Sequence, residues 1–148
     1  MMPFDAYLQG GREPIGRLPK GKCRRGYGLK LQRIGHQTTC AYCDTNLVDA
    51  YEHWLLLSVD HVIPVRAGEN AGIRKDWLED AWNTVICCSA CNGFGNRYEL
   101  PDGTIRPQTF DDFVRLRDAT FRIRKEIILG CHAKEKEFYQ QRPWEDHA

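Results

Sequence analysis

The sequence predicts a small α+β protein whose core is held together by a metal ion. Three observations support this fold class. Two short segments, "SVDHVIPV" (58–65) and "TVICC" (84–88), are rich in β-branched residues, two C-x-x-C pairs are present, and apolar residues recur at helical spacing from about Thr109 to Gln141. With 148 residues, 42% of them hydrophobic, the chain has the size of one domain with a modest core.

The first strand is expected over "WLLLSVDHV" (54–62), shortly before Pro64. It carries Asp60 and His61 near its end, and a buried carboxylate without a partner is costly. The pair is therefore either a structural ion pair or a working site. Because adjacent strand residues point to opposite faces, both can serve one site only where the strand ends or bulges.

The remaining elements follow from local patterns. Helices are expected at "YGLKLQRIG" (27–35), at "RKDWLEDAW" (74–82) and from "SACNGFGNRY" (89–98), and a connection is expected around Gly68, Asn70 and Gly72. Thr109 with Asp112 resembles a capping box at the start of the last helix. Gly130 favours a kink or a division within that helix.

The two C-x-x-C pairs predict a structural zinc site. Such spacing lets both thiolates of a pair face one ion, and two pairs complete a tetrahedral set of four sulfur ligands: Cys40, Cys43, Cys88 and Cys91. Between Cys43 and Cys88 lie 44 residues, more than the roughly 15–20 of a simple zinc ribbon, so a further structural unit is expected between the two pairs.

The other cysteines and histidines have plainer interpretations. Cys87 is expected to be a core-facing strand residue, although a register in which it replaces Cys88 stays open. No partner in the sequence is evident for Cys23 or Cys131. His36, His53 and His132 are expected to be surface or structural residues.

Charge is distributed unevenly along the chain. Residues 1–35 hold eight basic and two acidic residues, a net charge of +6, whereas residues 36–148 hold 13 basic and 18 acidic residues, a net charge of −5. The basic segment is typical of an arm that meets a polyanion, and a solvated tail is the alternative.

Composition also excludes some classes of protein. The longest apolar run, "WLLLSV", is too short to span a bilayer, and no secretory signal precedes the odd number of seven cysteines, so a disulfide framework is not expected. The sequence indicates a soluble cytoplasmic protein with no membrane partner, and a homodimer is compatible with it.

The order of these motifs resembles the HNH nuclease family. Between Cys40 and about Tyr98 the chain reads Cys-x-x-Cys, Asp60-His61, Asn83, then Cys-x-x-Cys followed directly by Asn92. The resemblance implies a ββα-metal core at residues 36–100, preceded by the basic arm (1–35) and followed by a helical extension (101–148) within a single domain. The implied activity is metal-dependent hydrolysis of DNA phosphodiester bonds.

The resemblance assigns a role to each of these residues. His61 is the general base, and its unperturbed pKa of about 6.5 suits proton transfer near neutral pH. Asp60 and Asn92 are the oxygen ligands of a catalytic Mg²⁺ or Mn²⁺, which holds the phosphate and the leaving oxygen. Asn83 is expected to fix the loop between the strands through backbone hydrogen bonds.

Two positions depart from the usual family pattern. Asn92 stands where many relatives have His, which makes this an H-N-N form and favours Mg²⁺ over softer metals. Gly95 stands where Lys is common, and Arg97 is the substitute phosphate contact. The expected DNA-binding residues are Arg24, Arg25, Lys30, Arg33 and Arg97.

Two other functions compete with the nuclease. One is a zinc-stabilised nucleic-acid-binding module without catalysis, which the basic arm supports but which has no use for a strand-end Asp-His. The other is a redox or metallochaperone protein, which leaves Asn83, Asn92 and the arm unexplained.

Overall fold

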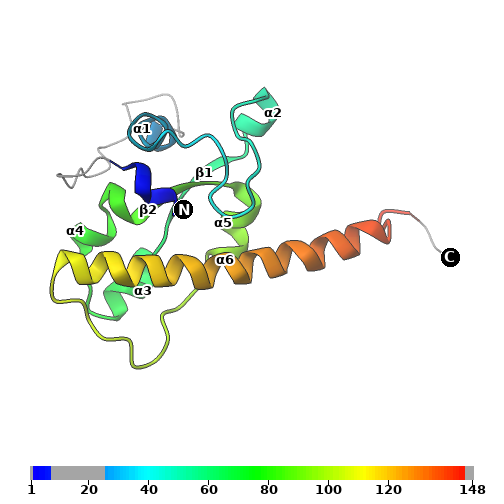
Figure 1. The fold of residues 1–148 in the computed structure, drawn as a ribbon. Helices are drawn as coiled ribbons and strands as arrows, with labels where there is room; N and C mark the ends of the chain where they lie inside the picture. Colours follow the sequence, from blue (N-terminus) through cyan, green and yellow to red (C-terminus); the bar gives the residue numbers. More distant parts are fainter. Residues whose placement is uncertain (1, 8–25, 146–148) are drawn as a thin grey trace.

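The computed structural model describes residues 2–7 and 26–145. In this part of the chain, two antiparallel strands, β1 (Leu57–His61) and β2 (Thr84–Cys88), form a small sheet, with Leu57 opposite Cys88 and His61 opposite Thr84. Helices pack around the sheet, and the longest of them runs across one side of the molecule (Figure 1). The chain is thus a mixed helix-and-sheet protein, as predicted.

Both strands lie where their β-branched residues predict them, but β1 is shorter than expected. The segment before it forms the short helix α2 (Tyr51–Trp54), and β1 ends at His61. Every residue of β2 is buried, including Cys87, which therefore faces the core as predicted. The strand-end position predicted for His61 is confirmed.

The connection between the strands contains more helix than the sequence indicates. Helix α3 (Val65–Asn70) occupies the stretch expected to be irregular, and the helix expected at 74–82 is divided into α4 (Lys75–Leu78) and the 3₁₀ helix η2 (Ala81–Asn83). Asp80 separates these two, since its side chain accepts a hydrogen bond from the Trp82 backbone and caps η2.

Helices α1 (Gly26–Gly35), α5 (Ser89–Gly95) and α6 (Phe110–Gln140) match the predicted elements. The capping box of α6 is confirmed, because Asp112 N donates to Thr109 Oγ1 at 3.1 Å and Thr109 N donates to Asp112 Oδ2 at 3.3 Å. The helix continues through Gly130 without division. Its first half packs on the core, and its second half is exposed and extends away from the body (Figure 1).

Part of the predicted basic arm belongs to the core. The 3₁₀ helix η1 (Pro3–Ala6) buries Phe4, which meets Phe121 of α6 edge to face at 5.6 Å, and Tyr7 donates a hydrogen bond to the Thr84 carbonyl. Leu31 of α1 is also buried. The boundary predicted at residue 35 therefore does not separate a solvated arm from the core, and residues 8–25 of the arm lie outside the described part.

Among the helices described, none combines the length and the apolar composition needed to cross a membrane.

Candidate functional site

The four predicted zinc ligands gather at one end of the sheet. Their sulfur atoms all lie within 4.8 Å of one another. Cys40 and Cys43 lie in the turn enclosed by the bridge between Thr39 and Asn46, whereas Cys88 ends β2 and Cys91 lies in the first turn of α5. Two segments far apart in the sequence thus supply the two halves of one cluster.

The cluster fits a tetrahedral zinc ion in both spacing and donor chemistry. A Zn–S bond of about 2.3 Å in a tetrahedron separates two sulfur atoms by about 3.8 Å, and the Sγ atoms of Cys43 and Cys88 lie 3.8 Å apart. Hydrogen bonds with the thiols of Cys40 and Cys91 lower the pKa of Cys88 below that of a free thiol, which favours a thiolate in the cluster. Four cysteines this close can hold a metal such as zinc.

His132 of α6 contacts the cysteine cluster and packs against Phe94 of α5. His132 Nε2 lies 2.9 Å from Cys91 Sγ, and the His132 ring packs edge-on against Phe94. His132 was expected on the helix surface, but it is half-buried, because the buried stripe of α6 continues past Ile128 by one more turn. That i, i+4 spacing is the sequence signal that could have identified it.

We expect any Cys→Ser change in the cluster to release the metal and to lower thermal stability, since metal binding to such sites contributes directly to folding. Elemental analysis and melting curves of C40S, C43S, C88S and C91S measure both effects. Cys131→Ser, at a half-buried cysteine outside the cluster, is the control and should retain the metal. Purified wild-type protein without bound zinc would contradict the prediction.

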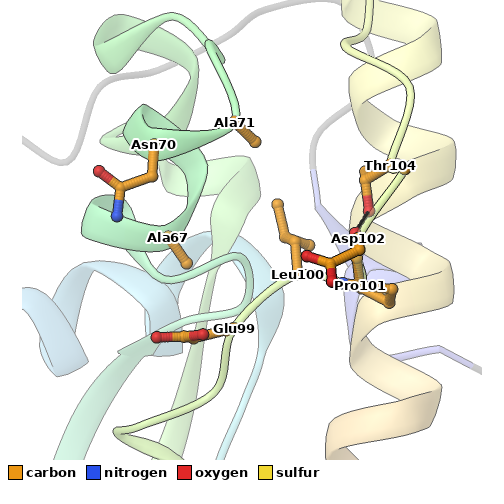
Figure 2. Close-up of a pocket in the computed structure, with 9 residues that line it drawn as sticks. Ala67, Asn70, Ala71, Glu99, Leu100, Pro101, Asp102 and Thr104 are labelled. Carbon is orange, nitrogen blue, oxygen red and sulfur yellow. Dashed lines mark hydrogen bonds between the residues drawn. The ribbon is translucent and has the colours of Figure 1, made fainter.

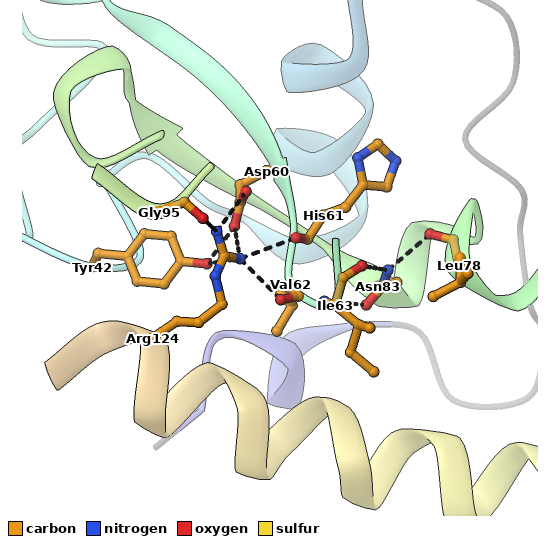
Figure 3. A network of polar contacts seen from close by, with 9 residues as sticks. All are labelled: Tyr42, Asp60, His61, Val62, Ile63, Leu78, Asn83, Gly95 and Arg124. Carbon is orange, nitrogen blue, oxygen red and sulfur yellow. Dashed lines mark hydrogen bonds and ion pairs between the residues drawn. The ribbon is translucent and has the colours of Figure 1, made fainter. Parts of the chain in front are cut away.

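Asp60 lies in a buried ion pair. Its Oδ2 accepts a hydrogen bond from Arg124 Nη1 at 2.6 Å, its Oδ1 faces Arg124 Nη2 at 3.3 Å, and the Tyr42 hydroxyl also donates to Oδ2 (Figure 3). Asp60 is 6% exposed and Arg124 is 1% exposed. Both oxygen atoms of the carboxylate are therefore already engaged by groups of the protein.

His61 points to the other side of the strand. Figure 3 shows its imidazole turned away from the guanidinium of Arg124. The ring is half-buried and makes no hydrogen bond with any described residue. Burial lowers its pKa from 6.5, and the nearby charge of Asp60 offsets only part of this effect. The imidazole is therefore neutral at pH 7 and able to accept a proton.

Asn83 joins the end of β1 to the segment before β2. Its Oδ1 accepts a hydrogen bond from Ile63 N at 3.0 Å, and its Nδ2 donates to the carbonyls of Ile63 at 2.9 Å and Leu78 at 2.8 Å (Figure 3). Asn83 is fully buried. These backbone contacts fix the chain that follows His61, which is the geometry implied by the family resemblance.

Asn92 and the predicted DNA-binding residues are less constrained. Asn92 is half-buried, and its side chain has no hydrogen bond to another residue of the described ranges. Arg33 on α1 and Arg97 after α5 are exposed, and Lys30 belongs to α1. Arg24 and Arg25 lie outside the described residues.

The predicted pair of oxygen ligands does not form a ready site for a divalent ion. Asn92 has the right donor and is accessible, but Asp60 is closed off by Arg124 and Tyr42. Both oxygen atoms of Asp60 already accept hydrogen bonds from Arg124 or Tyr42, so a divalent ion at this carboxylate would compete with these groups. This arrangement differs from the predicted one, in which Asp60 and Asn92 hold Mg²⁺ or Mn²⁺ together.

One hollow in the surface lies away from these residues. It has a volume of about 330 Å³ and lies between the end of α3 and the loop of residues 99–104 (Figure 2). Neither His61 nor Asn92 lines it.

Comparisons with models of protein families, with curated protein sequences and with solved structures found no match to this chain. The function must therefore be inferred from the residues and their geometry.

Proposed function

We propose that this chain is an HNH endonuclease that hydrolyses phosphodiester bonds in DNA, with His61 as the general base. The observation that carries the proposal is the state of His61: a neutral, half-buried imidazole without a hydrogen-bond partner in the described residues, at the end of a strand. A structural histidine in such a place normally satisfies its ring nitrogens with neighbours. A base that must accept a proton from water keeps one nitrogen free.

The surrounding elements support the same proposal. Strands β1 and β2 are followed directly by α5, and the four cysteines join this unit to the preceding turn, which is the arrangement expected of a zinc-stabilised ββα-metal core. Asn83 holds the chain that follows His61, so the ring has a fixed place from which to act. Mg²⁺ or Mn²⁺ remains the predicted cofactor.

The test is incubation of the zinc-loaded protein with supercoiled plasmid, with Mg²⁺, with Mn²⁺ and with EDTA. Conversion to nicked or linear plasmid in a divalent ion, but not in EDTA, supports the proposal. Binding of the plasmid without any cleavage under all conditions would contradict it.

One observation favours the second candidate, a zinc-stabilised nucleic-acid-binding module without catalysis. Asp60 forms a buried ion pair with Arg124, so this residue of the adjacent pair Asp60 and His61 has a structural role. The ring of His61, which has no hydrogen-bond partner among residues 2–7 and 26–145, is the feature that this alternative does not explain.

We expect the cleavage rate to rise with pH and to level off, with its midpoint below pH 6.5. Only the neutral imidazole accepts a proton, and burial lowers the pKa of His61, so the neutral form dominates at a lower pH than for an exposed histidine. Rates of plasmid cleavage between pH 5 and 8 measure this. A midpoint well above 6.5 would assign the limiting proton transfer to another group.

We expect Arg24 and Arg25 to contact DNA phosphates directly, without reading the bases. Deleting residues 1–25 is unsuitable as a test, because it also removes the buried Phe4 and Tyr7. Arg24→Gln with Arg25→Gln leaves Phe4 and Tyr7 unchanged, and it should flatten the dependence of log Kd on log salt by about two, one for each arginine that no longer neutralises a phosphate. Lys134→Gln with Lys136→Gln, on the exposed end of α6, makes the same change of charge as a control. An identical effect in both double variants would show that only net charge matters.

A further inference from the structure

Arg124 lies in a cage of oxygen atoms at the end of β1. Besides the carboxylate of Asp60, its guanidinium donates to backbone carbonyls from two elements: Nη1 lies 3.0 Å from His61 O and 2.9 Å from Val62 O, and Nη2 lies 2.7 Å from Gly95 O (Figure 3). Arg124 therefore joins α6 to the end of β1 and to the last turn of α5. Carbonyl and carboxylate oxygens are also the ligands of hard cations, so this cage is built for positive charge.

The surroundings of Arg124 are shaped for a planar guanidinium. Its charged group lies 5.8 Å from the ring centres of both Tyr42 and Tyr98, within the range of cation–π attraction. A Cβ atom at Gly95 would lie 2.6 Å from Arg124 Nη2, so a larger residue there would have to displace the guanidinium. Glycine at that position is the departure from the family's usual lysine, and the close approach of Arg124 gives it a physical reason.

A divalent ion at Asp60 would have to displace Arg124. The two cations repel each other at one carboxylate, and both of its oxygen atoms already accept hydrogen bonds from Arg124 or Tyr42. Withdrawal of Arg124 would leave three carbonyls without this donor, two of them buried and that of His61 partly buried, which is unfavourable without replacement bonds. The ion pair is therefore the more stable occupant of this site.

We propose that the guanidinium of Arg124, rather than a divalent ion, is the cation bound by Asp60. Asp60 then acts through Arg124, holding the backbone of His61 and Val62 against α5. The proposal concerns the cation at Asp60 and holds whether or not the chain is a nuclease. A divalent ion used in cleavage would bind to Asn92 and to the substrate without Asp60.

The first test uses the zinc-loaded wild-type protein and follows the Nε–H signal of Arg124 by NMR during addition of Mg²⁺. This nitrogen is buried and has no hydrogen-bond partner in the described residues, so its signal is expected to be protected from exchange with water. It should remain unchanged at millimolar Mg²⁺. A shift with onset of rapid exchange would mean that the ion displaces Arg124, and would overturn the proposal.

The second test measures Mn²⁺ binding to the zinc-loaded protein from the EPR signal of free Mn²⁺. Asp60→Asn should bind Mn²⁺ within about twofold of wild type, whereas removal of a true ligand typically weakens metal affinity by about tenfold or more. Asp118→Asn is the matched control, since Asp118 pairs with Arg117 on the same helix, at 2.9 Å. A tenfold weaker affinity in D60N but not in D118N would overturn the proposal. If D60N does not fold, the NMR titration decides.

A third test measures whether Arg124 prevents a divalent ion from binding to Asp60. Arg124→Met leaves the carboxylate and the carbonyls of the cage without their cation, so it should bind Mn²⁺ about tenfold more tightly than wild type, and Asp60→Asn in the same background should abolish this increase. A folded R124M protein with wild-type Mn²⁺ affinity would count against the proposal. These readouts need no cleavage, so an inactive protein with an undisturbed Arg124 would overturn the nuclease function alone.

Discussion

His61→Ala should reduce DNA cleavage by about 10²–10⁴-fold while the protein stays folded and still binds DNA. The ring makes no hydrogen bond within the described residues, so its removal costs little structure, and neither the cysteine cluster nor the Arg124 contacts depend on its side chain. The backbone of His61 keeps its bond to Arg124 in the variant. Plasmid cleavage rates, DNA binding and melting curves, measured on the same preparation, separate chemistry from folding.

His53→Ala is the matched control for His61→Ala. His53 lies in α2 and pairs with Asp49 at 2.6 Å on the surface, so the same substitution there should leave cleavage unchanged. If His61→Ala cut DNA at the wild-type rate, the second candidate, a nucleic-acid-binding module without catalysis, would be the better description.

The parts of the fold that depend on local sequence were predictable. The strand "TVICC", the start of α6 at its capping box and the four clustered cysteines all follow from residues that are neighbours or from a motif with fixed spacing. The cysteine cluster was predictable because two C-x-x-C pairs favour a single four-sulfur metal site, whatever the length of the chain between them. Short helices such as α3 carry too little periodicity to be recognised, because six residues span fewer than two turns.

The partners of the site residues were not predictable from local patterns. From the sequence, Asp60 is either part of a structural ion pair or part of a working site. Its partner in the structure is Arg124, which lies 64 residues away on α6. In the sequence, nothing distinguishes Arg124 from the other arginines of α6. Arg124 is buried because α6 packs against β1 and α5. The position of η1 in the core has the same cause, since Phe4 and Tyr7 precede a basic stretch that dominates the local composition.

The Asp60–Arg124 pair lies in the interior, so we expect the loss of either partner to be strongly destabilising. Removing one partner leaves the other charge buried and unpaired, which typically costs about 3–5 kcal/mol. Arg124→Met should therefore lower the free energy of unfolding by about this amount, measured by chemical denaturation with zinc bound.

Asp60→Asn should cost a similar amount, because it leaves the guanidinium buried beside a neutral amide, and the double variant should be destabilised by clearly less than the sum of the two single effects. Arg115→Met is the matched control, an identical change on the same helix at an exposed pair with Asp112 that is also 2.6 Å long. Exposed pairs contribute little, since water solvates both charges in either state. If Arg124→Met were no more harmful than Arg115→Met, Arg124 would not be needed to balance the charge of Asp60, and the carboxylate would be free for the divalent ion that the sequence predicts.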